Sequence, residues 1–189
     1  IISKKIFIKN KILTPKYFAL NRKEFNSRAL IQNIKKNKIK LPIVIKPINE
    51  GSSLGVCIEK NITKLNSVAK LNFKKYDHLI FEEYIGGQEI QVAVINGKTL
   101  GAIELIPKRM FYDYKAKYMK SAKTKHIMPA RLKKNKYREV LKIAKCAHFA
   151  LGCKGVTRSD FKYHNGKFFI LELNTQPGMT NLSLVPEIA

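Results

Sequence analysis

Cysteine is scarce in this sequence, and the arrangement of the few that occur excludes two kinds of structure. Cys57, Cys146 and Cys153 are odd in number and form no CxxC or CxxH pattern. A disulfide framework or a zinc site normally shows such spacing, so neither is expected. The reducing cytosol is therefore the expected location.

Long apolar runs are also missing. No stretch approaches the roughly 20 apolar residues that a membrane-spanning helix needs, and the first residues lack the layout of a signal peptide. We therefore expect no membrane partner.

Acidic residues are few, with 13 Asp and Glu against 37 Lys and Arg, which gives a net charge of +24. Such an excess usually indicates nucleic acid as a partner. Here the lysines are scattered among asparagines and isoleucines, with no continuous basic block, a pattern more typical of codon bias. No specific nucleic-acid partner is expected. The stretch FYDYKAKY, residues 111–118, is typical of a lid or binding loop. Its aromatic and basic residues could also stack single-stranded bases, so nucleic-acid binding remains an alternative.

The 189 residues are 45% apolar, which suits one good core or two small ones. The hydrophobic patterns predict helices over residues 3–12, 21–37, 63–73 and 133–152, and strands over residues 16–20, 41–46, 56–58, 78–85, 89–95 and 98–106. Asn21 with Glu24 has the spacing of a capping box at the start of the second helix, and Thr63 can cap the third. This order favours an α+β protein with two lobes that divide near residues 74–77.

The main candidate site lies in a predicted hairpin within residues 155–184, which turns at Asn165-Gly166. Arg158 and Asp160 share one face of its first strand, and Glu172 and Asn174 share one face of its second. Charged groups are rare in so apolar a run unless something pairs them.

The register of this hairpin decides whether the two polar pairs meet. A two-residue turn would point Asp160 and Glu172 to opposite faces, because side chains alternate along a strand. A three-residue turn, His164-Asn165-Gly166 with a bulge at Gly166, would bring all four together, and this is the turn we predict.

Two interpretations of the four polar residues remain open. Two carboxylates and an amide oxygen form a hard-oxygen site suited to Mg²⁺ or Mn²⁺, with Arg158 left to face an anion. The alternative is an internal ion pair of Arg158 with Asp160 or Glu172 in an edge hairpin.

Other polar residues give weaker signals. The loop KPINEGSSLGV, residues 46–56, lacks the GK[ST] of a Walker motif, but its small residues could expose backbone N–H groups to phosphate, with Lys46 close by. A surface hairpin with a flexible tip is the simpler interpretation. His148 lies on the apolar stripe of the last helix and is expected in the core, whereas no partner is recognisable for the other three histidines. Exposed strand faces would explain some of the few glutamates, which are Glu82, Glu83, Glu89 and Glu104.

Five separated stretches together resemble the D-alanine:D-alanine ligases of the ATP-grasp superfamily. They are IVIKP with EGSSLGV, FEEYIGGQEI, FYDYKAKY, LGCKGVTRSDF and LELNTQPGMTNLSLVP. The resemblance implies an ATP-grasp fold with the nucleotide between two α+β lobes, residues 1–75 as the small (lid) subdomain and residues 76–189 as the central subdomain. It also implies formation of D-alanyl-D-alanine from two D-alanines and ATP for peptidoglycan synthesis.

The resemblance further implies roles for particular residues. Two Mg²⁺ or Mn²⁺ ions would be held by Asp160, Glu172 and Asn174. Arg158 and the Gly178 N–H would hold the oxyanion, Lys117 would reach the transferred phosphate, and Tyr118 with Ser52 would close the site over the first D-alanine. The ATP-binding residues would be Lys46, Gly51, Ser53, Gly55, Glu82, Glu83, Tyr84, Ile85 and, at the ribose, Glu89. Ser183 and Leu184 would hold the second D-alanine. Tyr118 favours a dipeptide over a depsipeptide.

The family's N-terminal domain, which supplies part of the substrate site and of the dimer contact, has no counterpart before Ile1 in this sequence. The resemblance therefore leaves two expectations, a ligase that is homodimeric at full length, or an ATP-grasp fragment that is inactive by itself.

Overall fold

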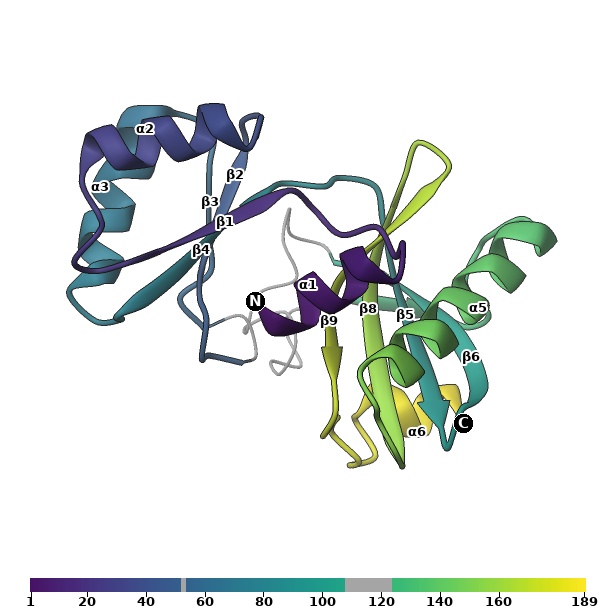
Figure 1. The fold of residues 1–189 in the computed structure, drawn as a ribbon. Coiled ribbons are helices and arrows are strands. Elements are labelled where there is room, and N and C mark those ends of the chain that lie inside the picture. The colour runs from purple at the N-terminus through teal and green to yellow at the C-terminus, as the bar shows by residue number, and fades with distance from the viewer. Residues whose placement is uncertain (52–53, 108–123) are drawn as a thin grey trace. The chain divides into compact units, whose positions relative to one another are not determined.

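The computed structural model describes residues 1–51, 54–107 and 124–189. These residues form two compact units, which are described separately below (Figure 1). The first unit contains Pro15–Tyr84. The second contains Ile2–Thr14 and the described residues from Ile85 onward. No helix among the described residues is both long and apolar enough to cross a membrane.

The first unit is an antiparallel sheet of four strands in the order β1-β4-β2-β3 with two helices. The strands are β1 (Tyr17–Asn21), β2 (Ile43–Pro47), β3 (Cys57–Glu59) and β4 (His78–Glu83), and the helices are α2 (Ser27–Lys36) and α3 (Ile62–Phe73). Alternate residues of β2, Ile43 and Ile45, are fully buried in a core that includes Leu65 of α3. The intervening residues, Val44 and Lys46, therefore lie on the opposite face of the sheet.

Both helices of this unit begin at asparagines that the sequence analysis did not identify as caps. The Asn26 side chain accepts a hydrogen bond from Ala29 N, and the Asn61 side chain accepts from Thr63 N. Asn21 and Glu24 do exchange the predicted reciprocal hydrogen bonds, but these close a turn that precedes α2. The predicted start of this helix at Asn21 is wrong because a capping box satisfies the same N–H groups in a turn as at a helix end.

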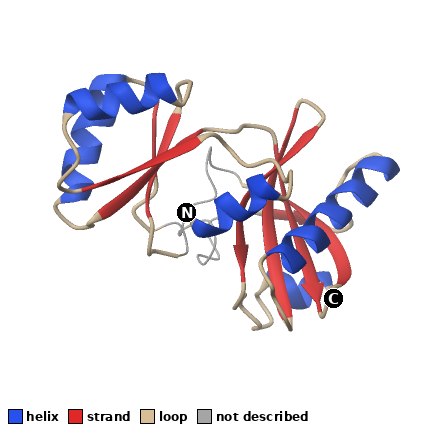
Figure 2. Cartoon of the chain, viewed as in Figure 1, coloured by secondary structure: helices blue, strands red, loops and turns tan. Residues whose placement is uncertain are grey.

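The second unit is an antiparallel sheet of five strands in the order β7-β6-β5-β8-β9 (Figure 2). The strands are β5 (Gln88–Ile95), β6 (Lys98–Ile106), β7 (Lys125–Ile127), β8 (Val156–His164) and β9 (Lys167–Asn174). The helices are α1 (Ile2–Lys9), α5 (Lys134–Ala150) and α6 (Leu184–Ile188). Val92, Phe161 and Ile170 pack in a core with Phe7 of α1 and Ala144 of α5. Helix α6 packs against β6 and β5, on the other side of the sheet from α5 (Figure 1).

His148 of α5 is a core residue, as predicted, with 1% of its surface exposed. Its Nδ1 lies 2.8 Å from Thr157 Oγ1 of β8. Burial lowers the pKa of His148 below its ordinary value, because the charged imidazolium is poorly solvated in the core.

This pKa predicts an acid-sensitive fold. The unfolded chain binds a proton at His148 more readily than the native chain, so the contribution is complete above about pH 6.5 and is lost as the pH falls. We expect the free energy of unfolding in urea to drop between pH 7.5 and pH 5.5 by up to about 1.4 kcal/mol per pH unit. The variant His148→Gln should show a flatter profile, and equal slopes for the two proteins would contradict the assignment.

Candidate functional site

The β8–β9 hairpin turns through two residues. His164 pairs with Lys167, and Asn165 and Gly166 have φ angles of +48° and +76°. Positive φ at both central residues is the geometry of a type I′ turn, which asparagine followed by glycine adopts at low cost. The predicted three-residue turn is therefore wrong.

A bulge farther along the hairpin nevertheless brings the four polar residues together. Phe161 pairs with Ile170, whereas Asp160 pairs with Glu172, so Leu171 is an extra residue in β9. One extra residue reverses which side chains share a face. As a result Asp160 lies directly opposite Glu172, and Arg158 lies opposite Asn174. The predicted convergence of the four side chains is confirmed, although the bulge that produces it lies in the strand and not at the turn.

Asp160 forms an ion pair with Arg158 on the same strand. Arg158 Nε donates to Asp160 Oδ1 at 2.8 Å, and a terminal nitrogen of Arg158 donates to Oδ2 at 3.0 Å. The two side chains are only 15% and 7% exposed, so this pair of hydrogen bonds is largely shielded from water. The internal ion pair that the sequence offered as an alternative is thus present. It does not displace Glu172 or Asn174 from the same face.

The donor set on this face fits a hard divalent cation. Asp160, Glu172 and Asn174 offer two carboxylates and an amide, the ligands that Mg²⁺ and Mn²⁺ prefer. The Nδ2 atom of Asn174 is buried and has no hydrogen-bond partner among the described residues, which indicates that this face accommodates a further polar group. No group of three His, Cys, Asp or Glu side chains with metal-ligand geometry occurs in the described part of the chain, so water or a ligand would have to complete the coordination.

Sequence reasoning missed Gln91 of β5, which pairs with Asp160 across the sheet and so lies on the same face. The sequence feature that could have identified Gln91 is a single amide within the apolar run IQVAVI. Next to it, Glu89 lies opposite Lys162, and Lys162 Nζ donates to Glu89 Oε2 at 2.9 Å. Both of these side chains are less than 15% exposed.

Glu104 is held by a structural ion pair. Its carboxylate accepts hydrogen bonds from Arg131 Nε at 2.9 Å, from a terminal nitrogen of Arg131 at 3.0 Å and from Gln88 Nε2 at 3.0 Å. Burial alone would raise the pKa of Glu104, but these hydrogen bonds outweigh burial and lower it. Glu82 and Glu104 are each only 2% exposed, so exposed strand faces do not explain these two glutamates.

In the first unit, two residues of the expected ATP site lie on the face of the sheet opposite the helices. Lys46 Nζ is 2.8 Å from Glu82 Oε2, and their side chains are 23% and 3% exposed. Tyr17 lies opposite Glu82, and its pKa is raised first by burial and then by the negative charge of Glu82. A lysine paired with a nearly buried carboxylate is held in one place, as a phosphate-binding cation requires.

The remaining residues of the expected ATP site lie at the ends of β2 and β4 or in the segments that follow these strands. Gly51 O accepts a hydrogen bond from Leu54 N, and Gly55, with φ +70°, lies against Pro47 at the end of β2. Glu83 ends β4, and Tyr84 N donates to Pro42 O. Ile85 is the next residue and is assigned to the second unit. Four further predicted residues, Ser52, Ser53, Lys117 and Tyr118, lie outside the described residues.

The structure brings Gly178 and Ser183 together after β9. A Cβ on Gly178 would lie 2.6 Å from Ser183 Oγ. The same Oγ accepts a hydrogen bond from Thr180 N at 3.1 Å, and Leu184 is buried at the start of α6. Helix α6 is also held by Glu187, whose Oε2 is 2.7 Å from His126 Nδ1. The expectation that His126 has no recognisable partner is therefore wrong.

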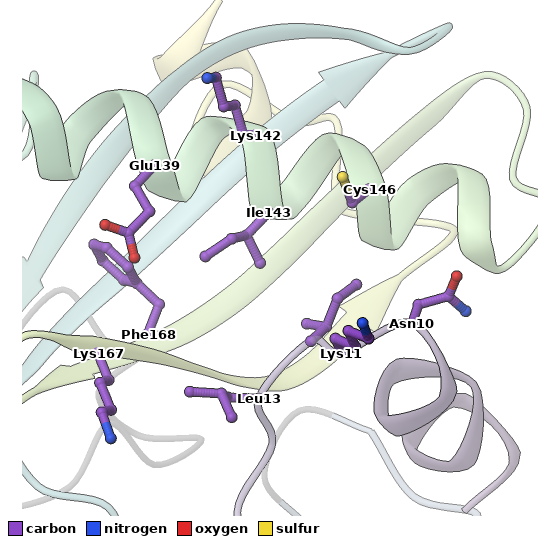
Figure 3. A pocket seen from close by; sticks show the side chains of 10 residues that line it. Asn10, Lys11, Leu13, Glu139, Lys142, Ile143, Cys146, Lys167 and Phe168 are labelled. Carbon is purple, nitrogen blue, oxygen red and sulfur yellow. The ribbon is translucent and has the colours of Figure 1, made fainter.

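A pocket of about 340 Å³ lies between the end of α1, helix α5 and the start of β9, on the α5 side of the sheet (Figure 3). Ile143, Cys146 and Phe168 line it together with Lys11, Lys142 and Lys167. It contains none of the site residues predicted from the sequence.

Two α+β units, with a lysine–glutamate ion pair on the sheet of one and converging acid and amide groups on the sheet of the other, define a protein with the ATP-grasp fold. The chain belongs to the D-alanine:D-alanine ligase family, because the family model described as "D-ala D-ala ligase C-terminus" matches residues 6–189.

Individual relatives agree with this assignment. A D-alanine–D-alanine ligase of Pelagibacter ubique is 60% identical over 190 residues, which cover 100% of this chain and 60% of the relative. The Bacillus anthracis D-alanine–D-alanine ligase complexed with ATP is similar in structure, with a TM-score of 0.79 and 28% identity over 98% of this chain and 57% of that one. The VanG D-Ala:D-Ser ligase of Enterococcus faecalis has a TM-score of 0.84 and 30% identity, covering 98% and 54%. The chain thus spans about 60% of the length of the curated relative.

Proposed function

We propose that this chain supplies the nucleotide- and metal-binding part of an enzyme that joins two D-alanines at the expense of ATP. The observation that carries the proposal is the pairing of Asp160 with Glu172 and of Arg158 with Asn174 on one face of a sheet. Membership of the ligase family and the ATP complex of a structural neighbour support it. The carboxylate of the first D-alanine would take the γ-phosphoryl group of ATP, and the amine of the second would displace phosphate from that acyl phosphate.

Each residue of the site has a task that suits its chemistry. Lys46, held by Glu82, would contact the α- and β-phosphates as a fixed positive charge. Glu89 keeps Oε1 for the ribose hydroxyls while Oε2 is held by Lys162. Bound Mg²⁺ or Mn²⁺ would neutralise the triphosphate at Asp160, Glu172 and Asn174.

The acyl-transfer step needs groups that hold negative charge. The Arg158 guanidinium and the Gly178 N–H would stabilise the oxyanion that forms when the amine attacks. Ser183 and Leu184 would hold the carboxylate of the second D-alanine. Lys117 at the transferred phosphate, and Tyr118 with Ser52 over the first D-alanine, complete the proposal. Because one structural neighbour is a D-Ala:D-Ser ligase, the choice of D-alanine as second substrate is part of the proposal.

Several wider features belong to the same proposal. The division into a lid, residues 1–75, and a central subdomain, residues 76–189, stays a prediction, as do the ATP roles of Gly51, Ser53, Gly55, Glu83, Tyr84 and Ile85. A role in peptidoglycan synthesis, a cytoplasmic location and a homodimer at full length are proposed from the family.

The test compares two proteins, this chain alone and this chain joined to the preceding residues of the Pelagibacter ubique relative. We expect release of phosphate that depends on D-alanine from the joined protein, and D-alanyl-D-alanine as its product. Absence of phosphate release from both proteins would refute the enzyme and favour an inactive ATP-grasp fragment. Binding of RNA or DNA that survives physiological salt would favour the nucleic-acid alternative.

A further inference from the structure

Gln91 lies at the centre of the polar face of the second unit. It is opposite Asp160 in the pairing of β5 with β8, and Asp160 is in turn opposite Glu172 in the pairing of β8 with β9. Directly opposed residues of antiparallel strands point to the same face, with Cβ atoms about 5 Å apart. The Gln91 amide is therefore adjacent to Asp160 and lies on the same face as Glu172, one strand farther along the sheet.

The Gln91 side chain is buried without satisfying its hydrogen-bonding groups. The residue is 1% exposed, and neither Nε2 nor Oε1 has a hydrogen-bond partner among the described residues. Leaving an amide in this condition costs free energy, since it loses its hydrogen bonds to water and gains none. The neighbouring Asp160 accepts hydrogen bonds from Arg158 on both of its oxygens, and neither Gln91 atom is hydrogen-bonded to it.

A second amide on the same face is in a similar condition. Nδ2 of Asn174 is also buried and has no partner in the described ranges. By contrast Gln88, three residues before Gln91 and on the opposite face of β5, donates to Glu104 Oε1 at 3.0 Å and to Arg131 O at 3.3 Å. Unsatisfied amides thus occur on the side of the sheet that carries Asp160 and Glu172, whereas the amide on the other side is satisfied.

We propose that Gln91 is a further ligand-binding residue of this site, one that contacts the metal–polyphosphate group of the nucleotide. Its Nε2 donates to a phosphate oxygen, and its Oε1 accepts from a water of the cation's hydration shell, so that both groups are satisfied only in the bound state. The inference rests on the proposed function and extends it to a residue of β5.

The proposal gives Gln91→Met opposite effects on stability and on binding. Methionine has a similar shape but no amide, so the ligand-free variant should unfold at a temperature equal to or higher than that of the natural chain. Its affinity for Mg²⁺–ADP, measured by calorimetry, should fall about tenfold, the equivalent of one hydrogen bond to a charged group. Affinity for adenosine, which has no phosphate, should not change.

Gln88→Met is the matched control on the same strand. This variant removes an amide with partners, so it should lower the unfolding temperature and leave the affinity for Mg²⁺–ADP unchanged.

Two results would overturn the inference about Gln91. In the first, Gln91→Met binds Mg²⁺–ADP as tightly as the natural chain. In the second, the ligand-free variant is less stable or does not fold, which would make the amide a structural group. Failure of the natural chain itself to bind Mg²⁺–ADP would instead refute the proposed function, so the two failures are distinguishable.

Discussion

Replacing Asp160 by asparagine should reduce D-alanine-dependent phosphate release by a factor of about a thousand or more, when measured in the chain joined to the preceding residues of its Pelagibacter ubique relative. The change keeps the shape of the side chain and removes its negative charge. The polyphosphate then loses a cation ligand at the point where charge develops during phosphoryl transfer. Affinity for Mn²⁺, measured in the chain alone, should fall in parallel.

The adjacent residue provides a matched control. Ser159 is fully buried on the α5 side of β8, and its hydroxyl has no hydrogen-bond partner in the described part of the chain. The variant Ser159→Ala should therefore retain activity and stability. If Asp160→Asn kept more than about a tenth of the activity while Mn²⁺ still bound, Asp160 would not be a metal ligand.

The variant Gly87→Ala should lose about 3 kcal/mol or more of its free energy of unfolding. Gly87 has a φ of +87°, and a Cβ added there would lie 2.2 Å from the backbone oxygen of Tyr163. An alanine costs roughly 1–2 kcal/mol in that conformation, and overpacking against a rigid strand adds about 1–3 kcal/mol. Tyr163 pairs with Gln88, so relief of this contact would separate β5 from β8 at the end that carries Glu89 and Lys162.

Urea unfolding of Gly87→Ala should be compared with that of Gly166→Ala. Gly166 also has positive φ, +76°, but an added Cβ would have no atom within 4 Å. Its replacement should cost only the conformational strain, about 1 kcal/mol. Similar losses in the two variants would show that the contact with Tyr163 contributes little.

The positions of the two hairpins of the second unit were predictable from the sequence because an Asn-Gly pair marks each turn locally, although the three-residue turn predicted for the second hairpin is wrong. Asn96-Gly97 and Asn165-Gly166 adopt positive φ at low cost, and the structure has φ values of +46° and +76° at the first and +48° and +76° at the second. The identity of the polar cluster was also predictable, since charged groups in an apolar strand require partners.

The position of the bulge was not predictable in this way. Leu171 is an ordinary strand residue, and neither its type nor its neighbours mark it as the extra one. Glu104 illustrates the same limit, because its main partner, Arg131, is 27 residues away in the sequence. Burial of a charge depends on such distant partners, whereas a pattern within one strand reports only local preference. For the same reason, Gln91 gained significance only when β5 was found beside β8.

The extra residue in β9 makes the pairing of this strand with β8 as important as its composition. If β9 kept Leu171 but paired with β8 without a bulge, Leu171 would lie opposite Asp160, and Glu172 would lie opposite Ser159 on the side covered by α5. Deleting Leu171 would instead remove the bulge and place Glu172 directly after Ile170, so Glu172 would still lie opposite Asp160. The loss of this one residue therefore preserves the facing of the acids, whereas the loss of the bulge without the loss of the residue does not. During evolution or in engineered variants, this hairpin can thus be shortened at the bulge by a single residue without turning Glu172 away from Asp160.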